Sequence, residues 1–216
     1  MIALKFLRAG RVGRFSGFRW PQAGLWVRPP ADGSACRHGV HACRVEDLPW
    51  WLDEELWEIE LEGDVIIGRH KLLAPAGRLV SRVDAWTPGL ANDYGVACGW
   101  RARDHAVRAL DRAARPAAAA ALLACTTLDE VLTTARRLLE DSPAQRISLT
   151  MAGDGAFRAI SGAPPTSAYI AAHAARHVDG GSGYATERAW QSNWLSTHLA
   201  LDAGPDPMPS TERGPS

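Results

Sequence analysis

The chain has 216 residues, and its 24 basic and 24 acidic side chains give a formal net charge of zero. An apolar share of 46% and a charged share of 22% are ordinary for a globular protein, which excludes a wholly disordered or fibrous chain. Zero net charge argues against a general nucleic-acid coat and against a polybasic membrane binder.

The N-terminus does not resemble a targeting segment. Lys5, Arg8, Arg11 and Arg14 interrupt the stretch in which a signal peptide needs an unbroken apolar run. No later stretch approaches the roughly 18 consecutive apolar residues of a membrane-spanning helix. The sequence therefore predicts a cytoplasmic protein with no membrane partner, in which the four cysteines are buried apolar groups, metal ligands or redox groups rather than disulfides.

Residues 1–88 alternate short apolar runs with glycine and proline, which predicts a mostly antiparallel sheet. The clearest strand follows Leu56, where Trp57, Ile59 and Leu61 alternate with glutamates. This period of two indicates one buried and one solvated face.

Residues 89–201 have a helical, Ala-rich pattern instead. Helices are expected over residues 91–113, from Thr127 to the Asp-Ser-Pro of residues 141–143, over residues 165–177 and over residues 184–201. Thr127 and Glu130 have the spacing of a capping box.

Two further segments complete the expected organisation. Residues 146–160 contain two apolar runs around Gly-Asp-Gly, which predicts a β-hairpin. The polar, Pro-rich residues 202–216 predict a disordered tail. The expected fold class is α+β, with a β-rich domain over residues 1–88 and a mostly helical domain over residues 89–201.

Charge is balanced over the whole chain but not along it. Residues 1–30 carry six basic side chains and no acid, whereas residues 46–64 carry nine acids and no base. One interpretation is that the two segments are neighbours with complementary solvated faces. The other is that the basic segment contacts phosphate, with interleaved aromatic rings that stack on bases. The aromatic residues concerned are Phe15, Phe18, Trp20 and Trp26. A functional basic groove should lie open, whereas a paired one should be covered by the acidic strand.

A dense cluster of thiols and imidazoles lies in the segment Cys36-Arg-His38-Gly-Val-His41-Ala-Cys43. These are the ligand types that tetrahedral zinc prefers, so Cys36, His41 and Cys43 are candidate metal ligands, with a further ligand from elsewhere in the chain. The alternative is structural: Cys43 lies in the core and His41 hydrogen-bonds a neighbouring carbonyl or carboxylate.

At this cluster the sequence resembles a family of small bacterial and phage proteins with a domain of unknown function. The family segment is Cys-x-x-Gly-x-His-Ala-Cys, matched by residues 36–43, and the resemblance covers about residues 3–85. Other matching positions are Gly17-Phe18, Leu48-Pro49-Trp50-Trp51, Glu58-Ile59-Glu60 and Lys71. The resemblance implies a shared domain rather than an activity. The helical half is similar to Ala-rich C-terminal regions of actinobacterial proteins.

The order of elements is also similar to that of ADP-ribosyltransferase-like domains, in which a strand, a helix and a glutamate-bearing strand follow one another. This similarity implies NAD as substrate, with His41, Glu58 and Glu60 as catalytic residues in a cleft. Arg8 or Arg19 would then hold the dinucleotide. Clear Ser-Thr-Ser or His-Tyr-Glu sets are missing from the sequence.

The leading hypothesis is a non-catalytic, Trp-rich binding protein whose partner is another protein or a small molecule. Its candidate ligand contacts are Arg8, Arg19 and Trp50, and nucleic acid stays open as a partner through residues 1–30. The alternatives are the NAD-using enzyme and a structural zinc protein. A cleft shared by His41 and the two glutamates would favour the enzyme, whereas a flat solvated row of glutamates would favour binding.

Overall fold

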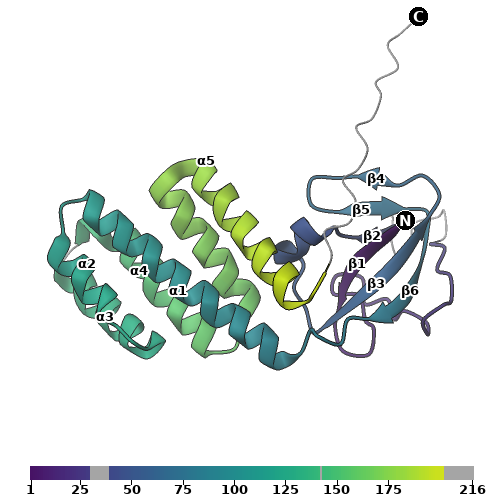
Figure 1. The fold of residues 1–216 in the computed structure, drawn as a ribbon, viewed down its shortest axis with the longest axis horizontal. Helices are drawn as coiled ribbons and strands as arrows, with labels where there is room; N and C mark the ends of the chain where they lie inside the picture. Colours follow the sequence, from purple (N-terminus) through teal and green to yellow (C-terminus); the bar gives the residue numbers. More distant parts are fainter. Residues whose placement is uncertain (30–38, 142, 202–216) are drawn as a thin grey trace, which may run out of the picture.

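The computed structural model describes residues 1–29, 39–141 and 143–201. Strands gather at one end of the molecule and helices at the other, and the chain passes from one to the other between Arg82 and Pro88 (Figure 1). The α+β fold class is confirmed. Cys36, His38 and the predicted tail over residues 202–216 lie outside the described residues.

The sheet region forms as the period-two pattern predicts. Its strands are β1 (Ile2–Leu7), β2 (Val40–Ala42), β3 (Glu55–Glu62), β4 (Ile66–Ile67), β5 (Leu72–Ala74) and β6 (Ala76–Arg82). They form two antiparallel sheets, ordered β1-β3-β6 and β2-β5-β4. The backbones of Leu4 and Cys43 exchange hydrogen bonds of 2.8 and 2.9 Å, which join the sheets side by side. In β3, Trp57, Ile59 and Leu61 are buried, so the predicted alternation is confirmed.

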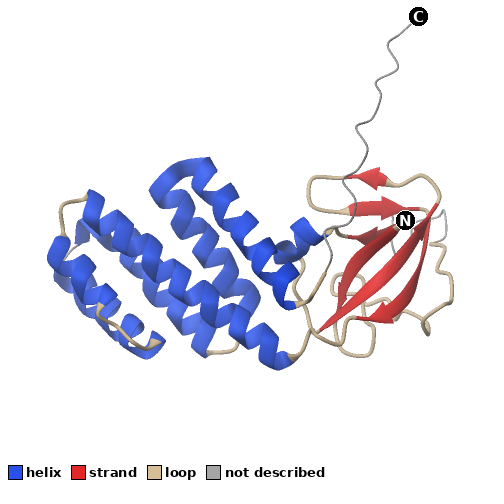
Figure 2. Cartoon of the chain, in the orientation of Figure 1, coloured by secondary structure: helices blue, strands red, loops and turns tan. Residues whose placement is uncertain are grey.

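The helical region contains α1 (Pro88–Arg112), α2 (Pro116–Leu123), α3 (Leu128–Asp141), the 3-10 turn η2 (Pro143–Gln145), α4 (Arg146–Ile160) and α5 (Pro164–His198) (Figure 2). The predicted capping box is confirmed at the start of α3. The Glu130 N–H donates to Thr127 Oγ1 and the Thr127 N–H donates to the Glu130 carboxylate, each at 3.2 Å. None of the helices in the described part of the chain is both long enough and apolar enough to span a membrane.

The predicted hairpin over residues 146–160 is wrong, because this segment is the helix α4. Its glycines permit close helix packing rather than a turn. A Cβ added at Gly155 would lie 2.7 Å from the Cβ of Ala102 on α1, and one at Gly153 would lie 3.5 Å from the Cβ of Ala135 on α3. Ala152 and Ala156 are fully buried on the same helix. Small residues at helical spacing therefore outweigh the local turn preference of Gly-Asp-Gly.

The predicted pair of C-terminal helices is found within the element labelled α5, whose two helical halves meet at Gly180. Gly180 has φ 66° and ψ −148°, values that only glycine adopts readily. The chain folds back at this point, so both halves of α5 lie along the bundle (Figure 1).

One hydrophobic cluster spans the sheet and the bundle, and each region has a further cluster of its own. Leu4 and Phe6 of β1 belong to the same buried cluster as Tyr94 of α1 and Leu195 of α5. The 3-10 helix η1 (Val45–Trp50) lies between α5 and the sheet (Figure 1). Ser192 Oγ donates to the Glu46 carbonyl at 2.7 Å and fixes this contact.

Candidate ligand-binding groove

A groove of about 990 Å³ lies beside β1 and β2. Residues 11–29 form much of its wall and belong to the purple loops beside the sheet in Figure 1. Its cationic lining residues are Lys5, Arg11, Arg14, Arg19 and Arg28, together with the imidazole of His41. Its aromatic lining residues are Phe6, Phe15, Phe18, Trp20, Trp26 and Trp51. No aspartate or glutamate occurs among the described residues that line it.

Two glutamates at the start of β3 hold the loop that forms this wall. The Ala9 N–H donates to the Glu54 carboxylate, and the Gly10 and Arg11 N–H groups donate to the Glu55 carboxylate. Gly10 and Arg11 both have positive φ, so this tight turn needs such anchoring. Burial opposes ionisation of Glu55, but hydrogen bonds from Trp57 Nε1 and from the two backbone N–H groups outweigh it and lower its pKa.

Two arginines of the groove donate hydrogen bonds to backbone carbonyls rather than to carboxylates. Arg14 Nη1 donates to the Leu52 carbonyl at 3.0 Å, and Arg11 Nε donates to the Trp20 carbonyl at 3.4 Å. Carbonyl partners orient a guanidinium without neutralising it. Arg28 is different, because it forms an exposed ion pair of 2.6 Å with Glu62.

Some aromatic rings of the groove are open to solvent. Phe15 is 82% exposed, with its ring edge-on to Trp51 at a centroid distance of 6.3 Å. Phe18 and Trp26 are half-buried, whereas Trp20 is buried and therefore belongs to the wall. A large apolar ring held at the rim of a cationic hollow is available for contact with a ligand.

Glu58 and Glu60 of the acidic segment point away from the groove. Glu58 accepts a hydrogen bond from Ser81 Oγ, and Glu60 forms an ion pair of 2.7 Å with Arg78. Both partners lie on β6, and neither glutamate lines the groove that contains His41. The convergence of His41, Glu58 and Glu60 that the NAD-using hypothesis requires is therefore not formed by these residues.

The two described members of the Cys/His cluster differ in their surroundings. The backbone carbonyl of His41 accepts a hydrogen bond from Lys5 Nζ at 2.5 Å, and His41 lines the groove. Cys43 is buried, and its thiol donates to the Leu4 carbonyl at 3.4 Å. Burial raises the pKa of the Cys43 thiol far above its usual range, which keeps it protonated.

Among the described residues, no three His, Cys, Asp or Glu side chains lie close enough together to hold a metal ion. Cys36, which the zinc hypothesis also uses, lies outside them. The zinc site therefore stays a prediction.

The ligand contacts predicted from the sequence do not all lie at the groove. Arg19 lines the groove, whereas Arg8 does not. Trp50 lies at the contact with α5, stacked on His70 at 4.0 Å with the Arg188 guanidinium 4.8 Å from its ring. Its neighbour Trp51 lines the groove instead, so of the two adjacent tryptophans the sequence analysis chose the wrong one as ligand contact. The Leu-Pro-Trp-Trp segment carries the signal, because a 3-10 helix turns about 120° per residue and so points adjacent rings in different directions.

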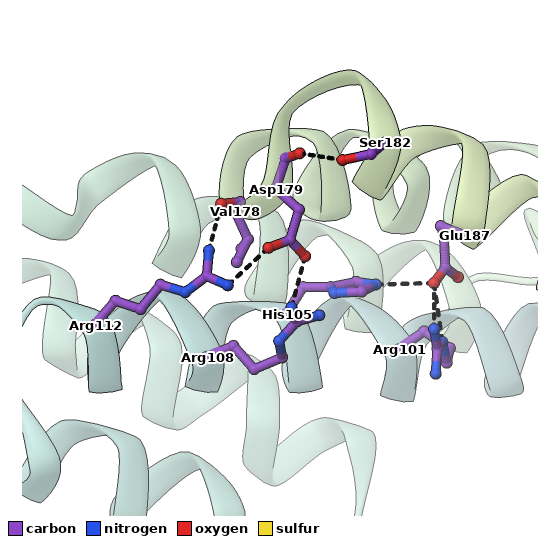
Figure 3. A network of polar contacts seen from close by, with 8 residues as sticks. All are labelled: Arg101, His105, Arg108, Arg112, Val178, Asp179, Ser182 and Glu187. Atoms are coloured by element: carbon purple, nitrogen blue, oxygen red, sulfur yellow. Dashed lines mark hydrogen bonds and ion pairs between the residues drawn. The ribbon is translucent and has the colours of Figure 1, made fainter.

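Polar contacts also join α1 to α5 in the helical bundle, buried around Glu187 and exposed around Asp179 (Figure 3). The Glu187 carboxylate is fully buried and accepts from Arg101 at 2.6 Å, with His105 Nε2 at 2.8 Å. Burial opposes ionisation of Glu187, but these two partners outweigh it and lower its pKa. Asp179 pairs with Arg108 at 2.6 Å and with Arg112 at 2.7 Å. None of these residues lines the groove described above, so we assign a structural role to them.

No protein-family model, curated protein or solved structure matches the chain. The similarity of residues 3–85 to a domain of unknown function therefore stays a prediction.

Proposed function

We propose that the chain is a non-catalytic cytoplasmic binding protein whose ligand site is the groove beside β1 and β2. The ligand carries an anionic group next to an aromatic or apolar part. One observation carries this proposal: cationic and aromatic side chains line the groove, and none of its described lining residues is a carboxylate.

The physical argument follows from how these charges are held. Arg14 hydrogen-bonds only a carbonyl, and Arg19 is exposed without a carboxylate at ion-pair distance among the described residues. A guanidinium in this state gains most from an anion supplied by a ligand, because such hydrogen bonds are charge-assisted and bidentate. Walls of low polarity beside the charges strengthen that attraction. Phe15 and Trp51 add apolar contact for the rest of the ligand.

The proposal can be tested with 1-anilinonaphthalene-8-sulfonate, which joins fused rings to one sulfonate. We expect saturable binding of one molecule by the folded protein, measured by fluorescence titration. The neutral N-phenyl-1-naphthylamine, which lacks the sulfonate, should bind about tenfold more weakly, since one charge-assisted contact contributes about 1.5 kcal/mol or more.

Variants locate the site. Arg14→Gln with Arg19→Gln should weaken sulfonate binding about tenfold. The matched control is Arg136→Gln with Arg137→Gln, which removes two exposed arginines from α3, far from the groove, and should leave binding unchanged. Equal affinity of the two double variants, or equal binding of the charged and neutral dyes, would contradict the proposal. Circular dichroism of each variant checks that the fold is retained.

A further inference from the structure

We infer that the groove binds a segment of single-stranded nucleic acid, an inference that rests on the proposed function and specifies its ligand. A single strand alternates phosphates with bases that are free to stack. The groove offers the complementary alternation of guanidinium groups and aromatic rings.

Cationic and aromatic groups are paired along the wall of the groove. The guanidinium carbon of Arg14 lies 5.8 Å from the ring centre of Phe15, and that of Arg28 lies 5.5 Å from the ring of Trp26. Phe18 and Arg19 are adjacent in the same lining. The two pairs, with Arg19 as a further cation beside Phe18 in the sequence, can contact successive nucleotides through phosphates and bases.

The exposure of the rings favours stacking over a purely ionic contact. Phe15 is 82% exposed at the rim, where its ring contacts Trp51 edge-on and leaves most of its surface open to solvent. Stacking on such a ring is open to bases in a single strand, whereas a duplex already stacks its bases internally. A volume of about 990 Å³ is at the upper end for one small molecule and accommodates several linked units.

The groove offers few groups that could distinguish one base from another. Its neutral polar lining side chains include Ser16 and Gln22, and no carboxylate is available among the described lining residues to accept from cytosine. We therefore expect binding that tolerates different sequences. DNA and RNA both offer phosphates and bases that can stack. Comparing the affinities of an oligouridylate and an oligothymidylate shows which of the two the groove prefers.

The direct test is fluorescence anisotropy with a labelled oligothymidylate of about ten nucleotides, a length within the usual range of single-strand site sizes. We expect it to bind about tenfold more tightly than an abasic strand of equal length, which has the same phosphates but no bases. It should also bind more tightly than the corresponding duplex.

Phe15→Ala should weaken oligothymidylate binding about tenfold and leave abasic-strand binding unchanged. The matched control is Phe157→Ala on α4, because Phe157 is also an exposed phenylalanine with an arginine beside its ring. This control variant should bind as the parent does. With three arginines involved, the logarithm of the binding constant should fall with the logarithm of salt concentration with a slope of roughly −2.

The outcomes separate this inference from the proposed function. Equal binding of the thymidylate and abasic strands, no binding of either, or an unchanged affinity in Phe15→Ala would overturn it. If the naphthalene sulfonate still binds through Arg14 and Arg19 in those cases, the groove remains an anion site and only the ligand class is wrong. If the sulfonate also fails, the proposed function fails with it.

Discussion

The helical bundle and the groove both contain clustered arginines, but the partners of these arginines differ between the two regions. In the bundle, Arg101 pairs with the buried Glu187, and Arg108 and Arg112 pair with Asp179 (Figure 3). In the groove, Arg14 has a carbonyl partner, and Arg19 faces solvent. The bundle therefore uses its charges to join helices, whereas Arg14 and Arg19 of the groove have no carboxylate at ion-pair distance among the described residues.

Because of this difference, a single substitution should affect either the stability of the fold or the affinity for a ligand, depending on the region in which it lies. Substitutions in the bundle should change the free energy of unfolding, because they leave buried polar groups without partners. Substitutions in the groove should change ligand affinity and leave stability almost unaltered. The following predictions test both halves of this comparison.

The largest effect is expected for Glu187→Gln. The amide cannot compensate the charge of Arg101 or accept equally from His105, so we expect a loss of about 3 kcal/mol in the free energy of unfolding, measured with urea. Glu140→Gln, at an exposed position on α3, is the control and should change it little. A loss below about 1 kcal/mol would show that the buried carboxylate is not a structural link.

The same variant has a defined pH dependence. The pKa of Glu187 is lowered in the folded state, so its stabilisation is complete above the ordinary value of 4.5 and is lost as pH falls through the folded pKa. The stability difference between the parent and Glu187→Gln should therefore shrink when unfolding is measured below pH 4.5. A difference that grows in acid would contradict this assignment.

A smaller loss is expected for Gly180→Ala, at the interruption that follows Asp179. Space is available for the methyl group, but the positive φ strains any residue with a Cβ, so we expect a loss of about 1–3 kcal/mol in thermal or urea unfolding. Gly181→Ala is the matched control. It has equal space and no positive φ, and should leave stability unchanged or raise it by up to about 1 kcal/mol. Equal effects of the two variants would remove the argument from backbone conformation.

The cap of α3 gives the next effect in size. Thr127→Ala removes the hydroxyl that accepts from the Glu130 N–H, so we expect a loss of about 1 kcal/mol in the free energy of unfolding. Thr133→Ala, at an exposed position within the same helix, should be neutral or slightly stabilising. If both threonines behave alike, the capping box contributes nothing measurable.

The smallest change in the free energy of unfolding is expected for a residue of the groove. Arg19→Gln removes an exposed charge without a carboxylate partner among the described residues, so the free energy of unfolding should stay within about 0.5 kcal/mol of the parent. A larger loss would show that Arg19 supports the fold and would weaken its assignment to ligand binding.

The sequence predicts those elements whose local pattern agrees with their final packing. The alternation of Trp57, Ile59 and Leu61 and the cap at Thr127 are both found in the structure. The segment over residues 146–160 is a helix because Gly155 lets α4 approach Ala102, a contact distant in sequence that outweighs the local turn signal.

The candidate site was predictable in its composition but not in its geometry. The cationic and aromatic character of residues 1–30 is visible in the sequence. Which acids face these residues depends on the pairing of β3 with β6, which directs Glu58 and Glu60 toward Ser81 and Arg78. The role of Trp51 depends on a 3-10 turn that places it apart from Trp50. Strand order and turn type are set by long-range packing, which a single sequence does not display.

The most direct test of the groove as a ligand site uses the indole N–H signals of the nine tryptophans in a ¹⁵N-labelled sample. Tryptophan-to-phenylalanine variants assign the signals before the naphthalene sulfonate is added. We predict that the signals of Trp26 and Trp51 shift on binding, while those of Trp100 and Trp190 in the bundle stay in place. Shifts confined to the bundle tryptophans, or no shift at saturating dye, would contradict the account.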